Sequence, residues 1–154
     1  MQLIALYPNL YFCSAYIQAG DKAEKEKAVD IKGGTETILI ADDEPVVTKY
    51  AKRLLTNIGY TVFTASDGME ALKIYKKQKE SIDIVILDLM MPVMSGEKAF
   101  EELLKINPKV KVIVSSGFSE DAAIKGILKK ANGFLSKPYK FEEAARLIRK
   151  VLDS

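Results

Sequence analysis

The stretch Ile82–Gly96, IDIVILDLMMPVMSG, determines how the rest of the chain is interpreted. It opens with the apolar run Ile84–Leu87, which is rich in β-branched residues and too short for a typical helix. Such a run predicts a strand buried on both faces, as in a parallel sheet. The strand ends at the carboxylate of Asp88, and Pro92 and Gly96 then lead the chain away through a loop. Because open α/β sheets bind ligands at the carboxyl ends of their strands, Asp88 is a candidate site residue.

Composition limits the classes of protein and of site that this chain can represent. The 154 residues suit one domain with a tail, and a formal net charge of +2 is too small to argue for binding to nucleic acid or membrane. The chain has no histidine and a single cysteine, Cys13, which excludes an internal disulfide and a structural zinc site of the usual kind. A lone cysteine fits a reducing compartment, so we expect a cytoplasmic protein.

The first 34 residues differ in composition from the remainder. Residues 1–20 are mostly apolar and aromatic. No lysine or arginine stands before the apolar part of this segment, and a proline interrupts it. This favours a segment that needs another surface for its burial over a signal peptide or a membrane helix. Residues 21–34 mix acidic and basic side chains and end in two glycines, as in a solvated linker with a flexible joint. We therefore predict an apolar segment and linker over 1–34 and a globular domain over 35–154.

From Thr35 onward, short apolar runs alternate with segments of helical periodicity. This alternation, with short connections, is typical of a parallel sheet whose helices cover both faces through right-handed crossovers. We predict an α/β fold: a flavodoxin-like, doubly wound sheet of five parallel strands in the order 2-1-3-4-5, with five helices. The predicted strands are Thr37–Ala41, Thr61–Ala65, Ile84–Leu87, Val110–Ser115 and Gly133–Ser136, and the predicted helices are Val46–Ile58, one capped by Ser66 or Asp67, Gly96–Ile106, Ser119–Ala131 and Phe141–Leu152.

Polar side chains follow four of the predicted strands, and in the predicted order these four strand ends share one rim. Crowded carboxylates raise one another's pKa unless a cation is present, and oxygen ligands without histidine or cysteine favour Mg²⁺ or Mn²⁺. Hydroxyl and ammonium groups bind phosphate, and a carboxylate can act as the nucleophile toward a phosphoryl group. The rim residues are Asp42-Asp43-Glu44 after the first strand, Asp88 after the third, Ser115-Ser116-Gly117 after the fourth and Lys137-Pro138 after the fifth.

This constellation, in this order, resembles the receiver domain of two-component response regulators over Thr35–Leu152. The resemblance implies that Asp88 accepts a phosphoryl group from a phosphohistidine in a Mg²⁺-dependent reaction. The donor would be a sensor histidine kinase or a histidine phosphotransfer domain, on another chain or in a separate domain, because this chain lacks histidine. The implied role is signalling rather than enzymatic turnover, with no contact to nucleic acid and none to a membrane through the receiver itself.

The resemblance also implies the ligands of the metal ion. Asp43 would bind Mg²⁺ directly, whereas Asp42 would bind it through water. The phosphoacceptor Asp88 and the main-chain carbonyl of Met90 would complete the ligands that the protein supplies.

Further residues match the phosphate-binding and switching positions of the family. Ser116 would donate a hydrogen bond to the phosphoryl group, and Lys137 would form an ion pair with it. Ser116 and Phe134 would move together on phosphorylation and change the surface of the fourth helix, the fifth strand and the fifth helix. The bond between Lys137 and Pro138 is expected to be cis.

Other roles remain open at the level of sequence. A pseudo-receiver would take no phosphate, and the intact acidic set argues against it. A phosphatase of the haloacid-dehalogenase type has its nucleophilic aspartate after the first strand and a second aspartate two residues later. Here Pro45 occupies that second position, so the match to this family fails. The receiver could be free-standing, or it could be the C-terminal receiver of a hybrid sensor histidine kinase. The segment Tyr11–Gly34 resembles the junction that precedes the receiver in such kinases. The stimulus, the cognate kinase, the output partner and the oligomeric state do not follow from the sequence.

Overall fold

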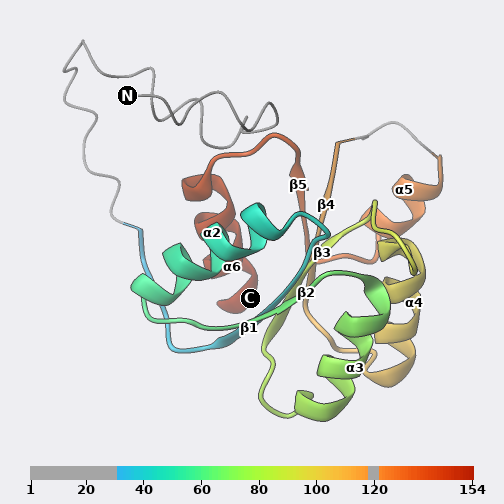
Figure 1. The fold of residues 1–154 in the computed structure, drawn as a ribbon, viewed down its shortest axis with the longest axis horizontal. Coiled ribbons are helices and arrows are strands. Elements are labelled where there is room, and N and C mark those ends of the chain that lie inside the picture. Colours follow the sequence, from blue (N-terminus) through green and yellow to red (C-terminus); the bar gives the residue numbers. More distant parts are fainter. Residues whose placement is uncertain (1–30, 118–121) are drawn as a thin grey trace.

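The computed structural model describes residues 31–117 and 122–154 (Figure 1). Five strands form one parallel sheet in the order β2-β1-β3-β4-β5, with α2 and α6 on one face and α3, α4 and α5 on the other. The predicted flavodoxin-like, doubly wound fold is therefore confirmed. The strands are β1 Thr37–Ala41, β2 Thr61–Ala65, β3 Ile84–Asp88, β4 Val112–Ser116 and β5 Gly133–Ser136, and the helices are α2 Pro45–Asn57, α3 Gly68–Gln78, α4 Gly96–Ile106, α5 Ala122–Leu128 and α6 Phe141–Leu152.

Each central strand contributes side chains to two separate hydrophobic cores, because successive side chains point to opposite faces of a sheet. In β1, Ile38 and Ile40 pack with residues of α2 and α6, whereas Leu39 packs with residues of α3 and α4. All five residues of β3 are buried, which explains why Ile84–Leu87 shows no alternation of apolar and polar residues. The edge strand β2 has partly exposed positions, as its mixed sequence indicates.

Local capping chemistry explains where two of the helices begin. Helix α2 starts at Pro45, one residue before the predicted start, because proline at the first helical position loses no intrahelical hydrogen bond. Helix α3 follows Asp67, whose side chain accepts a hydrogen bond from the Glu70 amide at 2.9 Å. Of the two predicted caps, Ser66 and Asp67, the aspartate is therefore the one that caps the helix.

The region around β4 and α5 departs most from the predicted boundaries. Strand β4 starts at Val112 rather than Val110, and α5 ends at Leu128 rather than Ala131. The predicted start of this helix at Ser119 lies outside the described residues, as does the predicted apolar segment over 1–20. Within the described ranges, no helix combines the length and the apolar composition needed to cross a lipid bilayer.

The residues just before β1 are packed against the domain, so the predicted flexible joint is wrong at this point. The Gly34 amide donates a hydrogen bond to the Ile58 carbonyl at 3.2 Å. A Cβ atom on Gly33 would overlap that carbonyl, and one on Gly34 would overlap the side chains of Glu36 and Arg149. Close approach of the Ile58 carbonyl therefore requires glycine at position 33, whereas a side chain at position 34 would force the Glu36, Tyr60 and Arg149 side chains to shift. The division of the chain at residue 34 remains a prediction.

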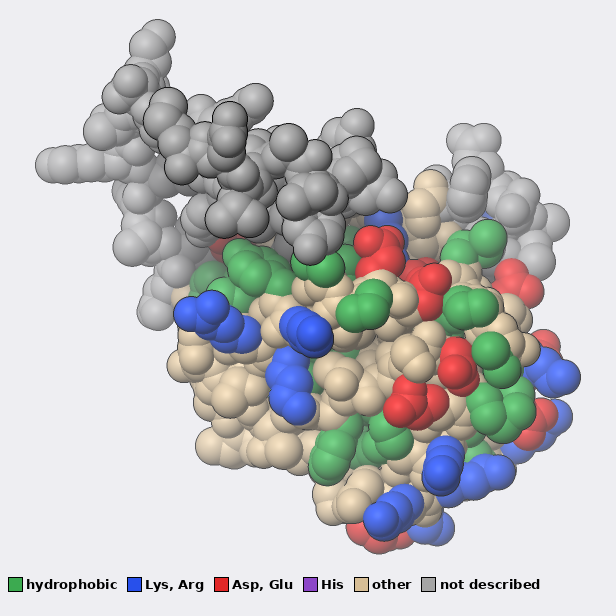
Figure 2. Space-filling model, viewed as in Figure 1, with side chains coloured by type: hydrophobic (Ala, Val, Ile, Leu, Met, Phe, Trp, Pro, Cys, Tyr) green, Lys and Arg blue, Asp and Glu red, His purple; other side chains and the backbone are tan. Residues whose placement is uncertain are grey.

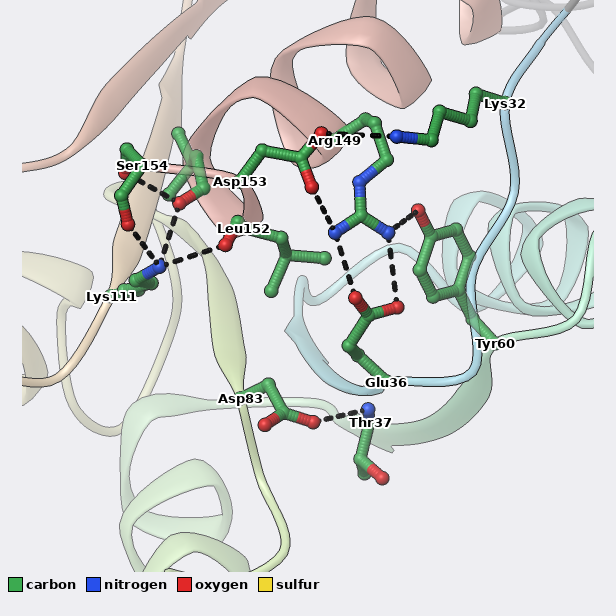
Figure 3. Close-up of polar contacts among 11 residues, drawn as sticks. Lys32, Glu36, Thr37, Tyr60, Asp83, Lys111, Arg149, Leu152, Asp153 and Ser154 are labelled. Atoms are coloured by element: carbon green, nitrogen blue, oxygen red, sulfur yellow. Dashed lines mark hydrogen bonds and ion pairs between the residues drawn. The ribbon is translucent and has the colours of Figure 1, made fainter.

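Arg149 of α6 connects this segment to the end of the last helix (Figure 3). Its guanidinium group binds both carboxylate oxygens of Glu36, at 2.7 and 3.1 Å, and one oxygen of Asp153 at 2.8 Å. The Tyr60 hydroxyl lies 3.4 Å from the same guanidinium, and Lys32 lies 3.4 Å from the other Asp153 oxygen. Hydrogen bonding to Arg149 lowers the pKa of Glu36 and that of Asp153.

We expect Arg149→Gln to lower the melting temperature by roughly 4 °C, because it removes the bidentate ion pair with Glu36. For a domain of this size, that shift corresponds to a loss of about 1 kcal/mol in the free energy of unfolding. Since folding lowers the pKa of Glu36, the stabilisation is present above its ordinary pKa and is lost as pH falls through the folded-state value. Thermal melts from about pH 7 to about pH 3 should therefore show the difference shrinking. Arg146→Gln, at an exposed position of α6, is the control and should be neutral at every pH. A difference for Arg149→Gln that is independent of pH would contradict this account.

Candidate functional site

The predicted site residues of β1, β3 and β5 meet at the carboxyl edge of the sheet. Lys137 Nζ lies 2.8 Å from Asp42 Oδ2 and 2.6 Å from Asp88 Oδ2. Carboxylate oxygens of Asp42, Asp43 and Asp88 all lie within 4.8 Å of one another. Lys137 and Asp42 are 95 positions apart in sequence, so the order of the strands is what produces this cluster.

The period of two in β-strands explains why these side chains share a face. Asp42 and Asp88 continue the rows of inward-facing isoleucines on β1 and β3 that pack against α2 and α6. Ser115 is the register partner of Asp88 on β4 and belongs to the same face. The chain then places Lys137 just beyond the end of β5, where its amide donates to the Ser116 carbonyl at 2.9 Å. The cluster is thus the polar end of the core under α2 and α6.

Backbone amides fix two of the three carboxylates. Asp42 Oδ1 accepts a hydrogen bond from the Glu44 amide at 2.9 Å, and Asp88 Oδ1 accepts one from the Met90 amide at 3.0 Å. Each carboxylate therefore uses one oxygen for its own loop and the other for the lysine. Asp42 and Asp88 are each only 4% exposed, whereas Asp43 is exposed. Asp43 is thus the carboxylate most open to a group that arrives from solvent.

The electrostatics of the cluster leave an excess of negative charge. Burial raises the pKa of Asp88 above its ordinary value, although hydrogen bonds from Lys137 and the Met90 amide act in the opposite direction. Burial alone would lower the pKa of Lys137, but its hydrogen bonds to Asp42 and Asp88 outweigh burial and hold that pKa above its ordinary value. One ammonium group thus faces three carboxylates, and such a site attracts a hard cation.

Comparison with known families identifies the family to which this chain belongs. The model of the response regulator receiver domain matches residues 38–149. The chain belongs to the response regulator receiver domain family. Receivers of this family are signalling domains of two-component systems, and the family implies a phosphoacceptor role.

Curated relatives of this receiver differ widely in length. Sensor kinase CckA of Brucella abortus is 37% identical over 136 residues, which are 88% of this chain and 14% of the kinase. The probable transcriptional regulator ycf27 of Guillardia theta is 38% identical, over 83% of this chain and 50% of the regulator. Chemotaxis protein CheY of Thermotoga maritima is 36% identical, over 74% of this chain and 95% of CheY. The receiver thus spans a small part of the first relative, half of the second and nearly all of the third.

Solved receivers have the same fold. A response regulator receiver domain protein from Clostridium thermocellum is 34% identical with a TM-score of 0.71, over 77% of this chain and 94% of that one. The CheX-CheY-BeF3-Mg²⁺ complex from Borrelia burgdorferi includes a chain that is 30% identical to this one, with a TM-score of 0.71. The match covers 75% of this chain and 88% of that one. TrrA from Thermotoga maritima, in complex with Mg²⁺-BeF, is 31% identical with a TM-score of 0.66. The match covers 75% of this chain and 98% of TrrA.

The structure gives positions to the remaining predicted residues of the receiver. Ser116 is completely buried at the end of β4, and its partner on β5 is two residues beyond Phe134, so Ser116 and Phe134 lie on the same face. That is the face covered by α3, α4 and α5, opposite to the face of Ser115. Met90 is 61% exposed in the loop after β3. The bond between Lys137 and Pro138 is cis, as expected.

The sequence pattern does not single out Tyr139, and it marks Ser115 only as part of a strand end. In the structure, burial raises the pKa of Tyr139 to about 12, although a hydrogen bond from the Ser115 side chain acts in the opposite direction. The available signal was the period of two, since Ser115 follows Ile113 by two positions and so shares its face.

The loop after Asp88 packs tightly against the backbone of the site. The Gly96 amide donates to the Leu89 carbonyl at 3.1 Å, and a Cβ atom on Gly96 would overlap the Asp88 carbonyl. The first residue of α4 is therefore a glycine because the helix begins directly against the candidate phosphoacceptor.

We expect Gly96→Ala to destabilise the receiver by about 1–3 kcal/mol, because the new methyl group must push the Asp88 backbone aside. Gly126→Ala is the matched control, since a Cβ atom there would meet nothing within 4 Å and the position lies in helix α5. This control should be neutral or stabilising by up to about 1 kcal/mol. Denaturant unfolding of the two variants measures the difference, and equal stabilities would contradict a close contact between position 96 and the Asp88 backbone.

Proposed function

We propose that this receiver accepts a phosphoryl group on the Asp88 carboxylate from a phosphohistidine of a partner protein. The observation that carries the proposal is the contact of 2.6 Å between Lys137 Nζ and Asp88, beside two further carboxylates within 4.8 Å. A buried carboxylate with a single neighbouring ammonium group is suited to nucleophilic attack on phosphorus, because the lysine can then neutralise the new phosphoryl charge.

The donor set of the cluster fits Mg²⁺. Its ligand atoms are hard carboxylate oxygens, and the chain has no histidine to favour a softer metal. Asp43 would bind the ion directly and Asp42 through water, while Asp88 and the main-chain carbonyl of Met90 would supply the remaining protein oxygens. When bound, Mg²⁺ would neutralise charge on the phosphoryl oxygens and orient them. Relatives solved with Mg²⁺ and a beryllium fluoride group support this assignment.

The proposed reaction transfers one phosphoryl group and is balanced within the two partners. An oxygen of Asp88 attacks phosphorus, an acyl phosphate bond forms, the bond from phosphorus to the histidine nitrogen breaks, and the imidazole leaves. Lys137 moves from the Asp88 oxygen to a phosphoryl oxygen while keeping its contact with Asp42. Ser116 donates its hydroxyl to another phosphoryl oxygen, and Phe134, on the same face, fills the space that this movement opens. The surface of α5, β5 and α6 would change as a result.

Acetyl phosphate tests the acceptor directly. With Mg²⁺, the intact mass of the parent should rise by one phosphoryl group, whereas Asp88→Asn should show no gain and chelation of Mg²⁺ should abolish the gain in the parent. An unmodified parent would favour a pseudo-receiver. Continuous release of phosphate from many donors, without an accumulated adduct, would favour a phosphatase.

The match to CckA favours a hybrid sensor histidine kinase as the setting of this receiver. The match covers 88% of the 154 residues, so it begins no later than about residue 20. It therefore includes part of the charged linker, whereas the family model starts at residue 38. Similarity before the receiver is expected if both receivers follow related kinase segments. The competing role is a free-standing regulator, which the 95% coverage of CheY from Thermotoga maritima supports.

Exposed hydrophobic side chains around the acidic edge would form the docking surface for the phosphodonor. Among the described residues, the exposed large hydrophobic side chains are Val46, Met69, Met90 and Val93, and all four belong to the loops or helix starts that follow β1, β2 and β3. Figure 2 shows hydrophobic side chains next to acidic ones on the visible face. Val93 is 84% exposed and has a φ angle of 66°, which is costly for a β-branched residue. Exposed apolar groups of this kind mark interaction sites.

We expect Val93→Asp to slow phosphoryl transfer from any phosphohistidine protein that phosphorylates the parent, by about tenfold or more, because a charge replaces an apolar contact. Phosphorylation by acetyl phosphate should be unchanged, since that donor needs no docking surface. Ser81→Asp introduces the same charge at an exposed position before β3, at the opposite edge of the sheet, and is the control. Equal losses with both donors would argue that Val93 supports the site itself rather than a protein contact.

A further inference from the structure

A tyrosine and a serine lie beneath the acidic cluster, on the side of the sheet that α2 and α6 cover. Ser115 is 1% exposed and is the register partner of Asp88 on the neighbouring strand. Tyr139 follows Lys137 by two residues and packs against the apolar core of this face. Ser115 and Tyr139 line the same small cavity, and a hydrogen bond from the Ser115 side chain lowers the pKa of Tyr139 against the larger effect of burial. Neither hydroxyl takes part in the transfer proposed above.

The pair borders a small cavity between the sheet and the two helices. The cavity has a volume of about 30 Å³, which is room for about one water molecule. Most of its wall is apolar, and its polar side chains are Asp42, Ser115 and Tyr139. The polar end of the cavity is therefore continuous with the cluster that holds Lys137 and Asp88.

Two hydroxyl groups in a mostly apolar wall are costly unless they bond to each other or to a neighbour. Burial raises the pKa of Tyr139 to about 12, so its phenol stays protonated and keeps its hydrogen-bonding capacity at physiological pH. Neighbouring strands lie about 4.8 Å apart, so a rotation about one bond could bring the Ser115 hydroxyl within hydrogen-bond distance of the Asp88 carboxylate. An added donor on that carboxylate would weaken it as a nucleophile.

We propose that Tyr139 is a positioning residue for phosphoryl transfer, whose hydroxyl holds the Ser115 hydroxyl away from Asp88. This arrangement leaves the two Asp88 oxygens to Lys137, to the Met90 amide and to the incoming phosphoryl group. The inference rests on the proposed acceptor role of Asp88. It adds a residue on the α2 and α6 side of the sheet whose effect reaches the phosphoacceptor through Ser115.

The test compares rates of phosphorylation by acetyl phosphate in saturating Mg²⁺. Tyr139→Phe keeps the ring and removes the hydroxyl, and should lower the maximal rate by about fivefold with little change in the half-saturating donor concentration. Adding Ser115→Ala to Tyr139→Phe should restore the rate, because the released hydroxyl is then absent. Tyr60→Phe removes a tyrosine hydroxyl from a buried side chain at the far end of the same core, and should change stability but not the rate.

A rate for Tyr139→Phe equal to that of the parent would overturn the positioning role. A double variant as slow as Tyr139→Phe would overturn it as well, because the loss would then be structural. The NMR shift of the Met90 amide, which donates to Asp88, gives a readout without phosphorylation. It should move in Tyr139→Phe and return in the double variant. If the parent takes no phosphoryl group while the Met90 shift behaves in this way, the acceptor role fails and the positioning contact stands.

Discussion

The ammonium group of Lys137 between Asp42 and Asp88 is the interaction on which the site depends. Two carboxylates that are each 4% exposed would repel each other strongly, and the lysine offsets this repulsion at 2.8 and 2.6 Å. The contact joins the end of β5 to the ends of β1 and β3, which are strands far apart in the sequence. With Asp43 added, the negative charge exceeds what one lysine can balance, and the edge is ready for a divalent cation.

The two ends of the sheet use charge in opposite ways. At the amino end, Arg149 and Lys32 face Glu36 and Asp153, so two cations balance two anions in a network that fixes the segment before β1 (Figure 3). At the carboxyl end, one cation faces three anions, and the balance is incomplete. A balanced network stabilises a fold, whereas an unbalanced one binds something from solution. The difference in charge therefore separates the structural end of the receiver from its reactive end.

The two faces of the sheet contribute different side chains near the carboxyl end. The face that carries Asp42 and Asp88 continues into a mostly apolar core, with Ser115 and Tyr139 near the cavity. The opposite face carries Ser116 and Phe134, the residues proposed above to move on phosphorylation. Because side chains alternate along each strand, residues 115 and 116 lie on different faces of the sheet. The proposed positioning and switching roles would therefore fall on opposite sides of the sheet.

The sequence by itself determined the elements, the fold class and the residues of the acidic edge, because strand and helix periodicity and strand-end chemistry are local properties. It could not determine that Gly33 and Gly34 pack against Ile58, since a glycine pair reads equally as a joint or as a close approach. Nor could it join Tyr139 to Ser115, which are 24 positions apart in the chain. Only the tertiary structure decided these contacts, because they depend on how neighbouring strands and helices pack in space, and no local pattern records that packing.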